Sequence, residues 1–260
     1  MGKILTNIIR IISIIIIIFI SYLISKAIKS SKAINTTLEQ GLEIIKKYTK
    51  LEEVDIGEYK KIIIKKLFPF YTTAYNIQNV GYLAILSCNF GFFQVFSFHL
   101  SPYKKDFPIL IIDYMQYFGY RNALFETYNA TIDKDNNSIK NFINEFEKLK
   151  KSNSDINDWK LSPQWADKRM MINMRKKGND SQDNKFISLF SDVIEIYMKN
   201  VIKMPKLEGD SKTKKADLIK EFAEQLVKKG GMAGKIFKSK MKEEDVIKLF
   251  VDIFFGFKFK

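Results

Sequence analysis

The chain of 260 residues contains a single cysteine, Cys88, and a single histidine, His99. One cysteine excludes an intramolecular disulfide, a cysteine-based zinc site and an iron–sulfur cluster. One histidine leaves almost no room for imidazole metal centres or for conventional Ser/His and Cys/His catalysis. A phosphate-binding glycine loop is also missing, because the glycine-rich stretch KKGGMAGK at 228–235 lacks both the spacing and a preceding strand. The remaining chemistry depends on carboxylates, hydroxyls, arginines and a bound substrate or cofactor.

The composition is that of a globular domain with excess positive charge. Hydrophobic residues make up 46% of the chain and aromatic residues 14%, which is enough apolar surface for one substantial core. The formal net charge of +14 favours an acidic partner, a nucleic acid or an anionic membrane surface. A nucleic-acid surface needs aromatic side chains interleaved with lysines, whereas Phe and Tyr here fall mostly at core-like positions. We therefore expect no nucleic-acid partner.

The N-terminus carries a hydrophobic run of fourteen residues, IISIIIIIFISYLI at 11–24. It is followed by the small-x-small triplet Ser25-Lys26-Ala27 and by a basic stretch without acidic residues as far as Glu39. We predict a two-part leader over residues 1–38 that directs a domain of residues 39–260 to a plastid of secondary origin, similar to an apicoplast. The alternative is a retained membrane anchor, because extending the run back to Ile4 gives about twenty residues.

The spacing of apolar residues predicts strands in the middle of the chain and helices on both sides of them. Helices are expected at 38–48, 138–151, 186–201, 216–228 and from 243 onward, with a turn at 162–164 and a mobile polar loop at 206–215. Aromatic and β-branched runs predict the strands of an antiparallel meander at 73–78, 81–89, 92–100, 107–113 and 123–132, with one more strand at 168–175. This order indicates an α+β fold in layers.

Asp113 ends the apolar run FPILIID, which has the composition of a strand buried on both faces. Burial of an ionised, unpaired carboxylate costs several kcal/mol, so this side chain must be paired, protonated or catalytic. A strand-end carboxylate satisfied by backbone amides or by Lys105 is the alternative to a catalytic acid.

Several of these segments together resemble the ferredoxin-dependent bilin reductases. The stretch FFQVFSFHLSPYKKDFPILIIDYMQYFG has that family's Gln-Val pair, a proline, and a second proline five residues before an aspartate. These residues are Gln94, Val95, Pro102, Pro108 and Asp113. The similarity continues over residues 70–255, through FETYNATID, LSPQWADKRMMINMR, the helix with Tyr197 and the pair Phe254 and Phe255.

This resemblance implies a three-layer α/β/α sandwich in which a central antiparallel sheet is flanked by helices. A biliverdin-like linear tetrapyrrole would lie between the sheet and the C-terminal helices. Reduced ferredoxin would supply single electrons, with no metal or flavin cofactor bound. Asp113 would be the proton donor, because desolvation raises the pKa of a carboxyl group in an apolar pocket. The implied protein is a monomer that touches a membrane only through its N-terminal segment.

Some positions depart from the family pattern. Ser97 stands where the family commonly has a histidine or asparagine, and His99 lies on the same strand face, about 7 Å farther along. His99 is a candidate to replace the missing group, or else a semi-buried strand residue with a satisfied ring. The family's second acid corresponds to Gly230, and its Gln-Pro pair to Asn129 and Ala130.

Substrate and partner contacts follow from the same resemblance. Arg175 would end its strand near the propionates of the pigment, with Arg169 or Lys168 in support and Asn129 at the pocket, although a solvated strand-end arginine is the alternative. An acidic ferredoxin would dock on a lysine rim, unless the clusters only reflect a lysine-rich composition. The candidates for this rim are Lys60, Lys61, Lys65, Lys66, Lys104, Lys105, Lys235, Lys238 and Lys240.

Other functions also fit the sequence. Loss of acids at Ser97 and Gly230 suits a protein that binds a tetrapyrrole without reducing it. Reduction of a chlorophyll breakdown product is a related enzymatic possibility. A membrane-tethered basic protein that recruits acidic partners is the structural alternative.

Overall fold

The computed structural model describes residues 2–64, 68–133, 136–162, 165–230 and 232–260. Lys65 and Lys66, and two residues of the turn expected at 162–164, lie outside these ranges. No side chains of residues 2–8 enter the description.

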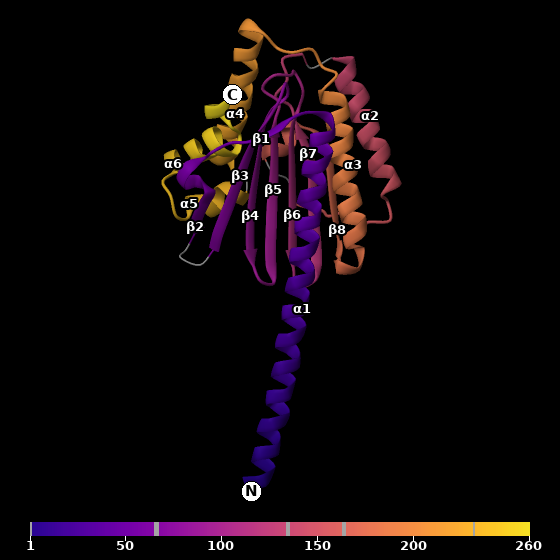
Figure 1. Ribbon diagram of the computed structural model, residues 1–260, viewed down its shortest axis with the longest axis vertical. Coiled ribbons are helices and arrows are strands. Elements are labelled where there is room, and N and C mark those ends of the chain that lie inside the picture. The colour runs from indigo at the N-terminus through magenta and orange to yellow at the C-terminus, as the bar shows by residue number, and fades with distance from the viewer. Residues whose placement is uncertain (1, 65–67, 134–135, 163–164, 231) are drawn as a thin grey trace.

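An antiparallel sheet of eight strands forms the middle layer (Figure 1). The strands follow one another in the order β1-β3-β4-β5-β6-β7-β8, and β2 pairs with β3. This arrangement confirms the expected meander and adds two short strands at one edge. The strands are β1 Leu51–Glu53, β2 Lys61–Ile64, β3 Phe68–Ile77, β4 Gly81–Phe90, β5 Phe93–Ser101, β6 Ile109–Tyr117, β7 Tyr120–Tyr128 and β8 Met170–Asn179.

Helices cover both faces of this sheet, which confirms the three-layer sandwich (Figure 1). One face packs against α1 Gly2–Tyr48, α2 Asn137–Ser152 and α3 Asp183–Val201 through a core that includes Phe96, Phe125 and Phe190. The other face packs against α4 Gly209–Lys229, α5 Met232–Lys238, α6 Glu243–Leu249 and the π-helical turn Phe250–Phe254. Two separate apolar cores result, one on each side of the sheet.

The polar loop expected at 206–215 is largely helical, because α4 already begins at Gly209. Lys215 lies in this part of α4. The sequence places it among solvated lysines, but the structure buries it completely. Its ammonium group donates to the carbonyl oxygens of Phe107 and Ala130, at 2.6 Å each, and lies 3.9 Å from the carboxylate of Asp106. These contacts attach the first turns of α4 to the end of the sheet.

Helix α1 is one continuous element that passes residue 38 without a break. Its C-terminal part packs on the domain, where Ile34, Ile44 and Ile45 are buried against α3 and the sheet. Its N-terminal part extends away from the domain, and the apolar side chains from Ile9 to Ile24 are mostly exposed (Figure 1). Among the described residues, α1 is the one helix whose length and composition suit a membrane span or a signal sequence.

A buried glutamine fixes α1 on the sheet well before residue 38. The side-chain amide of Gln94 donates to the carbonyl oxygen of Ala27, at 3.1 Å, and to the hydroxyl of Ser31, at 2.9 Å. A buried amide group without such partners would cost about 1–3 kcal/mol, so these bonds specify the position of the helix. The predicted boundary between residues 38 and 39 therefore falls inside a helix whose preceding three turns already contact the domain.

Gly41 provides a test of this packing, because Gly41→Ala should stabilise an undocked α1 but destabilise a docked one. A Cβ atom at this position would lie 2.5 Å from Cε1 of the buried Phe190. In an undocked helix, Gly41→Ala would stabilise by about 1 kcal/mol through helix propensity. In the docked helix, we expect it to destabilise the protein by about 1–3 kcal/mol through overpacking. Chemical unfolding of both proteins measures the difference, and a more stable variant would contradict the docking.

Candidate functional site

A cavity lies between the sheet and the C-terminal helices, on the face opposite α1. Its empty volume is about 1210 Å³, part of which is open solvent at the mouth. Strands β3 to β8 form one wall, and Leu226 of α4, Phe237 of α5 and Phe250 of the π-helical turn form the other. Small-molecule sites are mostly apolar with a few polar groups. This cavity has such a lining and is open at its mouth, so it suits an organic ligand that is largely apolar.

Strand pairing places polar and charged residues in one row across the floor of this cavity. Ser97 on β5 pairs with Asp113 on β6, Asp113 pairs with Leu124 on β7, and Leu124 pairs with Arg175 on β8. Paired residues in an antiparallel sheet point to the same face, so all four side chains face the cavity. Asp113 does not end its strand, as the sequence suggested, because β6 continues to Tyr117.

Ser97, His99 and Asp113 form a continuous chain of hydrogen bonds. The hydroxyl of Ser97 lies 2.8 Å from Nε2 of His99 and donates to Oδ1 of Asp113. A hydroxyl group can donate to one neighbour and accept from the other, and it can reverse both bonds when a proton moves. The structure thus brings together all three residues expected at the catalytic site, and it joins His99 to Asp113 through Ser97 rather than by direct contact. Lys105, the alternative partner of Asp113, instead donates to the carbonyl of Met204.

The surroundings of Asp113 raise its pKa from 3.8 to about 6. Burial is the main cause, and the negative charge of Glu126 adds to it, whereas the hydrogen bond from Ser97 acts in the opposite direction. An aspartic acid with this pKa can hold or release a proton near neutral pH, as a general acid must. The carboxyl group faces the cavity, where a bound ligand can reach it.

His99 is buried, and burial lowers the pKa of its ring to about 4. The ring is therefore neutral at physiological pH, with one nitrogen as a donor and the other as an acceptor. Nε2 is occupied by Ser97, whereas Nδ1 has no hydrogen-bond partner among the described residues. The rings of Phe254 and Phe255 lie against the imidazole, with centroid distances of 6.3 and 5.1 Å. The expected aromatic pair thus encloses the far end of the hydrogen-bonded chain.

Glu126 is a buried carboxylate in the cavity wall that the sequence analysis did not single out. Its Oε1 accepts from Nε of Arg175, at 2.6 Å, and its Oε2 accepts from the hydroxyl of Tyr128. A second carboxylate, Asp167, accepts from Nη2 of Arg175, at 2.7 Å. The alternation of Leu124, Glu126 and Tyr128 along β7 is the signal that would have placed Glu126 on the face of Asp113.

Arg175 lines the cavity, but it is neither at a strand end nor solvated. It lies in the middle of β8, which continues to Asn179, and only 10% of its side chain is exposed. Its guanidinium group already binds two carboxylates, so it neutralises the protein's own charge before any ligand arrives. Contact with the propionates of a ligand, which remains a prediction, would require the guanidinium group to share or exchange these partners.

The structure places Arg169 and Asn129 outside the cavity lining. Nη2 of Arg169 donates to Glu221, at 3.1 Å, and the guanidinium group lies over the ring of Trp165. The side chain of Asn129 accepts hydrogen bonds from the backbone and hydroxyl of Thr131, just after β7 ends. Both side chains stabilise loops at the edge of the cavity. Their predicted role in substrate binding is not tested by this placement.

Gly230, which the sequence resemblance aligns with an acid of the bilin reductases, is the glycine cap of α4. It ends α4 with a φ of +99°, in the left-handed region, and its N–H donates to the carbonyl of Leu226. A glycine adopts this conformation without the steric cost that an aspartate or glutamate would bear. The C-terminus of α4 therefore favours glycine over an acidic residue at this position.

The expected lysine rim is only partly available. Lys60, Lys61, Lys235 and Lys240 are exposed, Lys104 and Lys238 are half-buried, and Lys105 is buried, which removes it from any surface rim. Lys65 and Lys66 lie outside the described residues. Within the described part of the chain, no group of three or more His, Cys, Asp or Glu residues is arranged to hold a metal ion.

A solved structure has a fold similar to that of this protein. No protein-family model matches the chain, and neither does any curated protein. A crystal structure of phytochromobilin synthase from tomato, in complex with biliverdin, is similar with a TM-score of 0.70. The two sequences are 14% identical, and the match covers 85% of this chain and 83% of that chain. A similarity of this kind establishes a shared fold over most of both proteins.

Replacement of Asp113 is expected to stabilise the protein in a pH-dependent manner. Below pH 3.8 the carboxyl group is protonated in both states, between pH 3.8 and about 6 only the folded state keeps the proton, and above this range both states are ionised. Wild-type stability therefore falls as the pH rises through this window. We expect Asp113→Asn to be more stable than wild type by about 1–3 kcal/mol at pH 8 and nearly equal at pH 3.5. Equal stability at both pH values would refute the raised pKa.

Glu126→Gln tests the electrostatic coupling between the two carboxylates. Removal of the negative charge of Glu126 should lower the pKa of Asp113 by up to about one unit. Asp167→Asn is the matched control, because it also removes one carboxylate from Arg175 but leaves the neighbour of Asp113 in place. NMR titration of the Asp113 carboxyl carbon measures both effects. A shift of equal size in the two variants would mean that Arg175, and not Glu126, controls Asp113.

Proposed function

We propose that this protein binds a biliverdin-like linear tetrapyrrole in the cavity and reduces it with single electrons from a small acidic donor such as ferredoxin. The observation that carries the proposal is the position of Asp113, a carboxyl group with a raised pKa on the floor of a large apolar cavity. The similar tomato structure is a complex with biliverdin, a ligand of the class proposed here.

Reduction of one double bond consumes two electrons and two protons. Each electron makes the conjugated ligand more negative and hence more basic, so a nearby acid must deliver each proton. With a pKa of about 6, Asp113 is protonated in roughly one molecule in ten at pH 7. Negative charge that accumulates on the ligand raises the pKa of Asp113 further, as the charge of Glu126 already does. Asp113 therefore becomes protonated when the ligand requires a proton.

Ser97 and His99 would restore the proton that Asp113 loses. In one arrangement the hydroxyl of Ser97 donates to Asp113 and accepts from Nε2–H of His99. Transfer along this chain returns a proton to Asp113 and leaves both bonds reversed, with Nδ1 of His99 taking up a proton as Nε2 releases its own, so that the ring stays neutral. Burial lowers the pKa of the cationic ring to about 4, so His99 would act as a neutral relay and not as a stored cation.

The charge of the chain and the length of α1 bear on the electron donor and the compartment. The net charge of +14 and the exposed lysines favour a transient complex with an acidic protein, whose affinity would fall as salt increases. No bound cofactor is required in this scheme, since the donor supplies the electrons one at a time. A plastid destination remains part of the proposal, with the long apolar α1 acting either as a targeting signal or as a membrane anchor.

The packing of α1 argues against a leader that is removed as far as residue 38. Cleavage at residue 38 would remove Ile34 from the core and the partners of Gln94 from the sheet. Cleavage after Ala27 would keep most of the docked segment, although it would separate Lys26 from its ion pair with Asp180. We therefore propose that at least residues 28–48 stay with the mature domain.

A titration with biliverdin followed by reduction tests the proposed function. We expect the absorption spectrum of biliverdin to shift on binding, and to evolve to that of a reduced pigment when reduced ferredoxin is added without oxygen. Asp113→Asn should bind with a similar affinity and turn over at least about 100-fold more slowly, because general acid catalysis contributes about 10²–10⁴-fold. Ser97→Ala is the matched variant, which should slow turnover and keep the shift.

A tetrapyrrole-binding protein without reductase activity is the second candidate. The glycine cap at Gly230 favours it, because the family's second acid is absent there. A shifted spectrum that does not evolve would select this function. No shift with wild type would refute both, and normal turnover by Asp113→Asn would refute the proton donor alone.

A further inference from the structure

Two hairpin turns at one end of the sheet carry aromatic side chains where turns usually carry polar ones. Gly91 and Phe92 connect β4 to β5, and Phe118 and Gly119 connect β6 to β7. Tight turns favour Asn, Asp and Gly, since these residues accept positive φ and remain solvated. Phenylalanine satisfies neither requirement, so turn formation alone does not account for Phe92 and Phe118.

Phe118 adopts a backbone conformation that is unfavourable for its residue type. Its φ is +47° and that of Gly119 is +88°, the pattern of a type I′ turn. A bulky side chain in the left-handed region is strained, and such strain is typical of positions with a function. The ring nevertheless remains 54% exposed, so burial in the domain does not compensate for the strain.

The two turns form one rigid aromatic surface. The rings of Phe92 and Phe118 stack with a centroid distance of 4.6 Å and an interplanar angle of 15°, and the N–H of Phe118 donates to the carbonyl of Phe92 at 3.2 Å. Tyr120 extends this surface, with 59% of its area exposed. Further exposed aromatic residues at the same strand ends are Phe90 and Tyr117. We call these five residues the aromatic tip.

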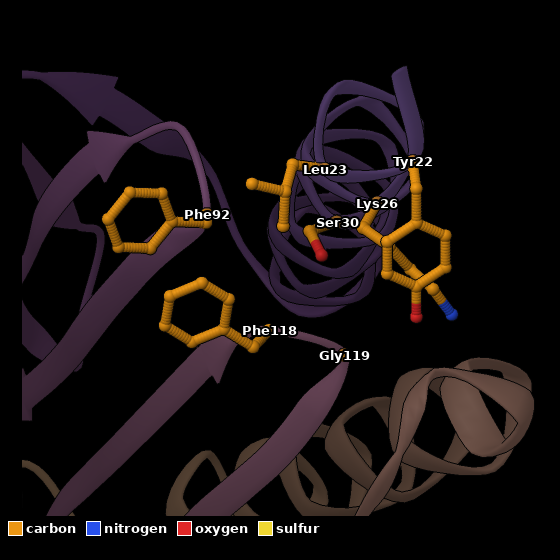
Figure 2. A pocket seen from close by; sticks show the side chains of 7 residues that line it. All are labelled: Tyr22, Leu23, Lys26, Ser30, Phe92, Phe118 and Gly119. Carbon is orange, nitrogen blue, oxygen red and sulfur yellow. The ribbon is translucent and has the colours of Figure 1, made fainter. Parts of the chain in front are cut away.

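The aromatic tip lies beside α1, at the point where the helix leaves the domain. Figure 2 shows Phe92 and Phe118 next to Leu23, with Tyr22 and Lys26 on the same part of the helix, and these residues line one small pocket. Toward the N-terminus, between Ile11 and Ile20, α1 is apolar apart from Ser13 and exposed on all sides. A helix that is apolar all round requires an apolar surrounding, which a bilayer provides.

Tyr22 and the lysines that follow it mark the level of the bilayer surface. Aromatic residues and lysines gather where a membrane-spanning helix meets the headgroups, because they combine apolar and polar parts. Lys26 and Lys29 lie on the next two turns of α1, and 53% of the Lys29 side chain is exposed. The aromatic tip is at the same level, so a bilayer crossed by α1 would meet Phe92 and Phe118 at its interface.

We propose that the aromatic tip is a second membrane contact, which inserts into the headgroup region of the phospholipid bilayer that α1 enters. Together, the helix and the tip hold the domain in one orientation, with the strands directed toward the membrane. The cavity wall reaches Phe93, next to Phe92, so one end of the cavity faces the bilayer in this orientation. Contact through the N-terminal segment alone, as the sequence suggested, would leave the aromatic tip in water.

Depth-dependent fluorescence quenching tests this contact in the full-length chain. Phe118→Trp is reconstituted in vesicles of phosphatidylcholine and phosphatidylserine that contain brominated lipids, with Trp159 and Trp165 of the parent protein as background. We expect blue-shifted emission and several-fold stronger quenching by lipids brominated near the headgroups than the parent shows. Lys206→Trp is the matched control at the other end of the sheet, where Lys206 is exposed and pairs with Lys105. It should be quenched by iodide from the water and not by lipid.

Two results would overturn the proposal. The first is Phe118→Trp emission that iodide quenches and brominated lipids do not. If the turns instead contact a second copy of the protein, Phe118→Cys will form an intermolecular disulfide, and this also contradicts the membrane contact. The second comes from Phe118→Gly, which removes the ring and relieves the positive φ. We expect its melting temperature to equal or exceed that of the parent. A marked decrease would mean that the ring serves the fold and not the membrane.

Discussion

The register between β5, β6 and β7 is the constraint on which the site depends. Side chains alternate along a strand, so a shift of one residue would turn Asp113 from the cavity into the opposite core. The apolar neighbours Ile112 and Tyr114 hold the register, because both are buried beneath the α1–α3 layer. The position of one carboxylate is thus fixed by the hydrophobic side chains on either side of it. A tight two-residue turn reinforces this arrangement at the β6–β7 end, where Tyr117 pairs with Tyr120.

A buried carboxyl group gains its chemistry from the balance of charges around it. Asp113 has a hydroxyl as its neighbour and no direct ion pair among the described residues, whereas Glu126, on the next strand, is bound by Arg175 and Tyr128. The two carboxylates therefore differ in role although they lie in one wall. Glu126 lies beside a cation, and its negative charge adds to the burial that raises the pKa of Asp113 to about 6. Pairs of acids with opposed environments are a common means of obtaining one proton donor near neutral pH.

The two faces of the sheet differ in how completely they are packed. The face beneath α1, α2 and α3 is a packed core with Gln94 as a polar attachment point for α1. The face beneath the C-terminal helices leaves space, and a π-helical turn at Phe250–Phe254 directs Phe250 into the cavity and Phe254 toward His99. π-helical turns often occur at functional sites, since the extra residue redirects the side chains that follow. A rigid face and an open face on one sheet allow a stable anchor and a ligand cavity to coexist.

The sequence by itself determined the order of the elements, the layered α+β class and the candidate acid, because periodicity and local composition are properties of neighbouring residues. Ser97 and His99 could be placed on one strand face for the same reason. The hydrogen-bonded chain through Ser97, the capture of Arg175 by two carboxylates, and the docking of α1 were decided only by the tertiary structure. Each of these joins residues far apart in the chain, and the charge state and reach of a side chain follow from partners that no local pattern specifies.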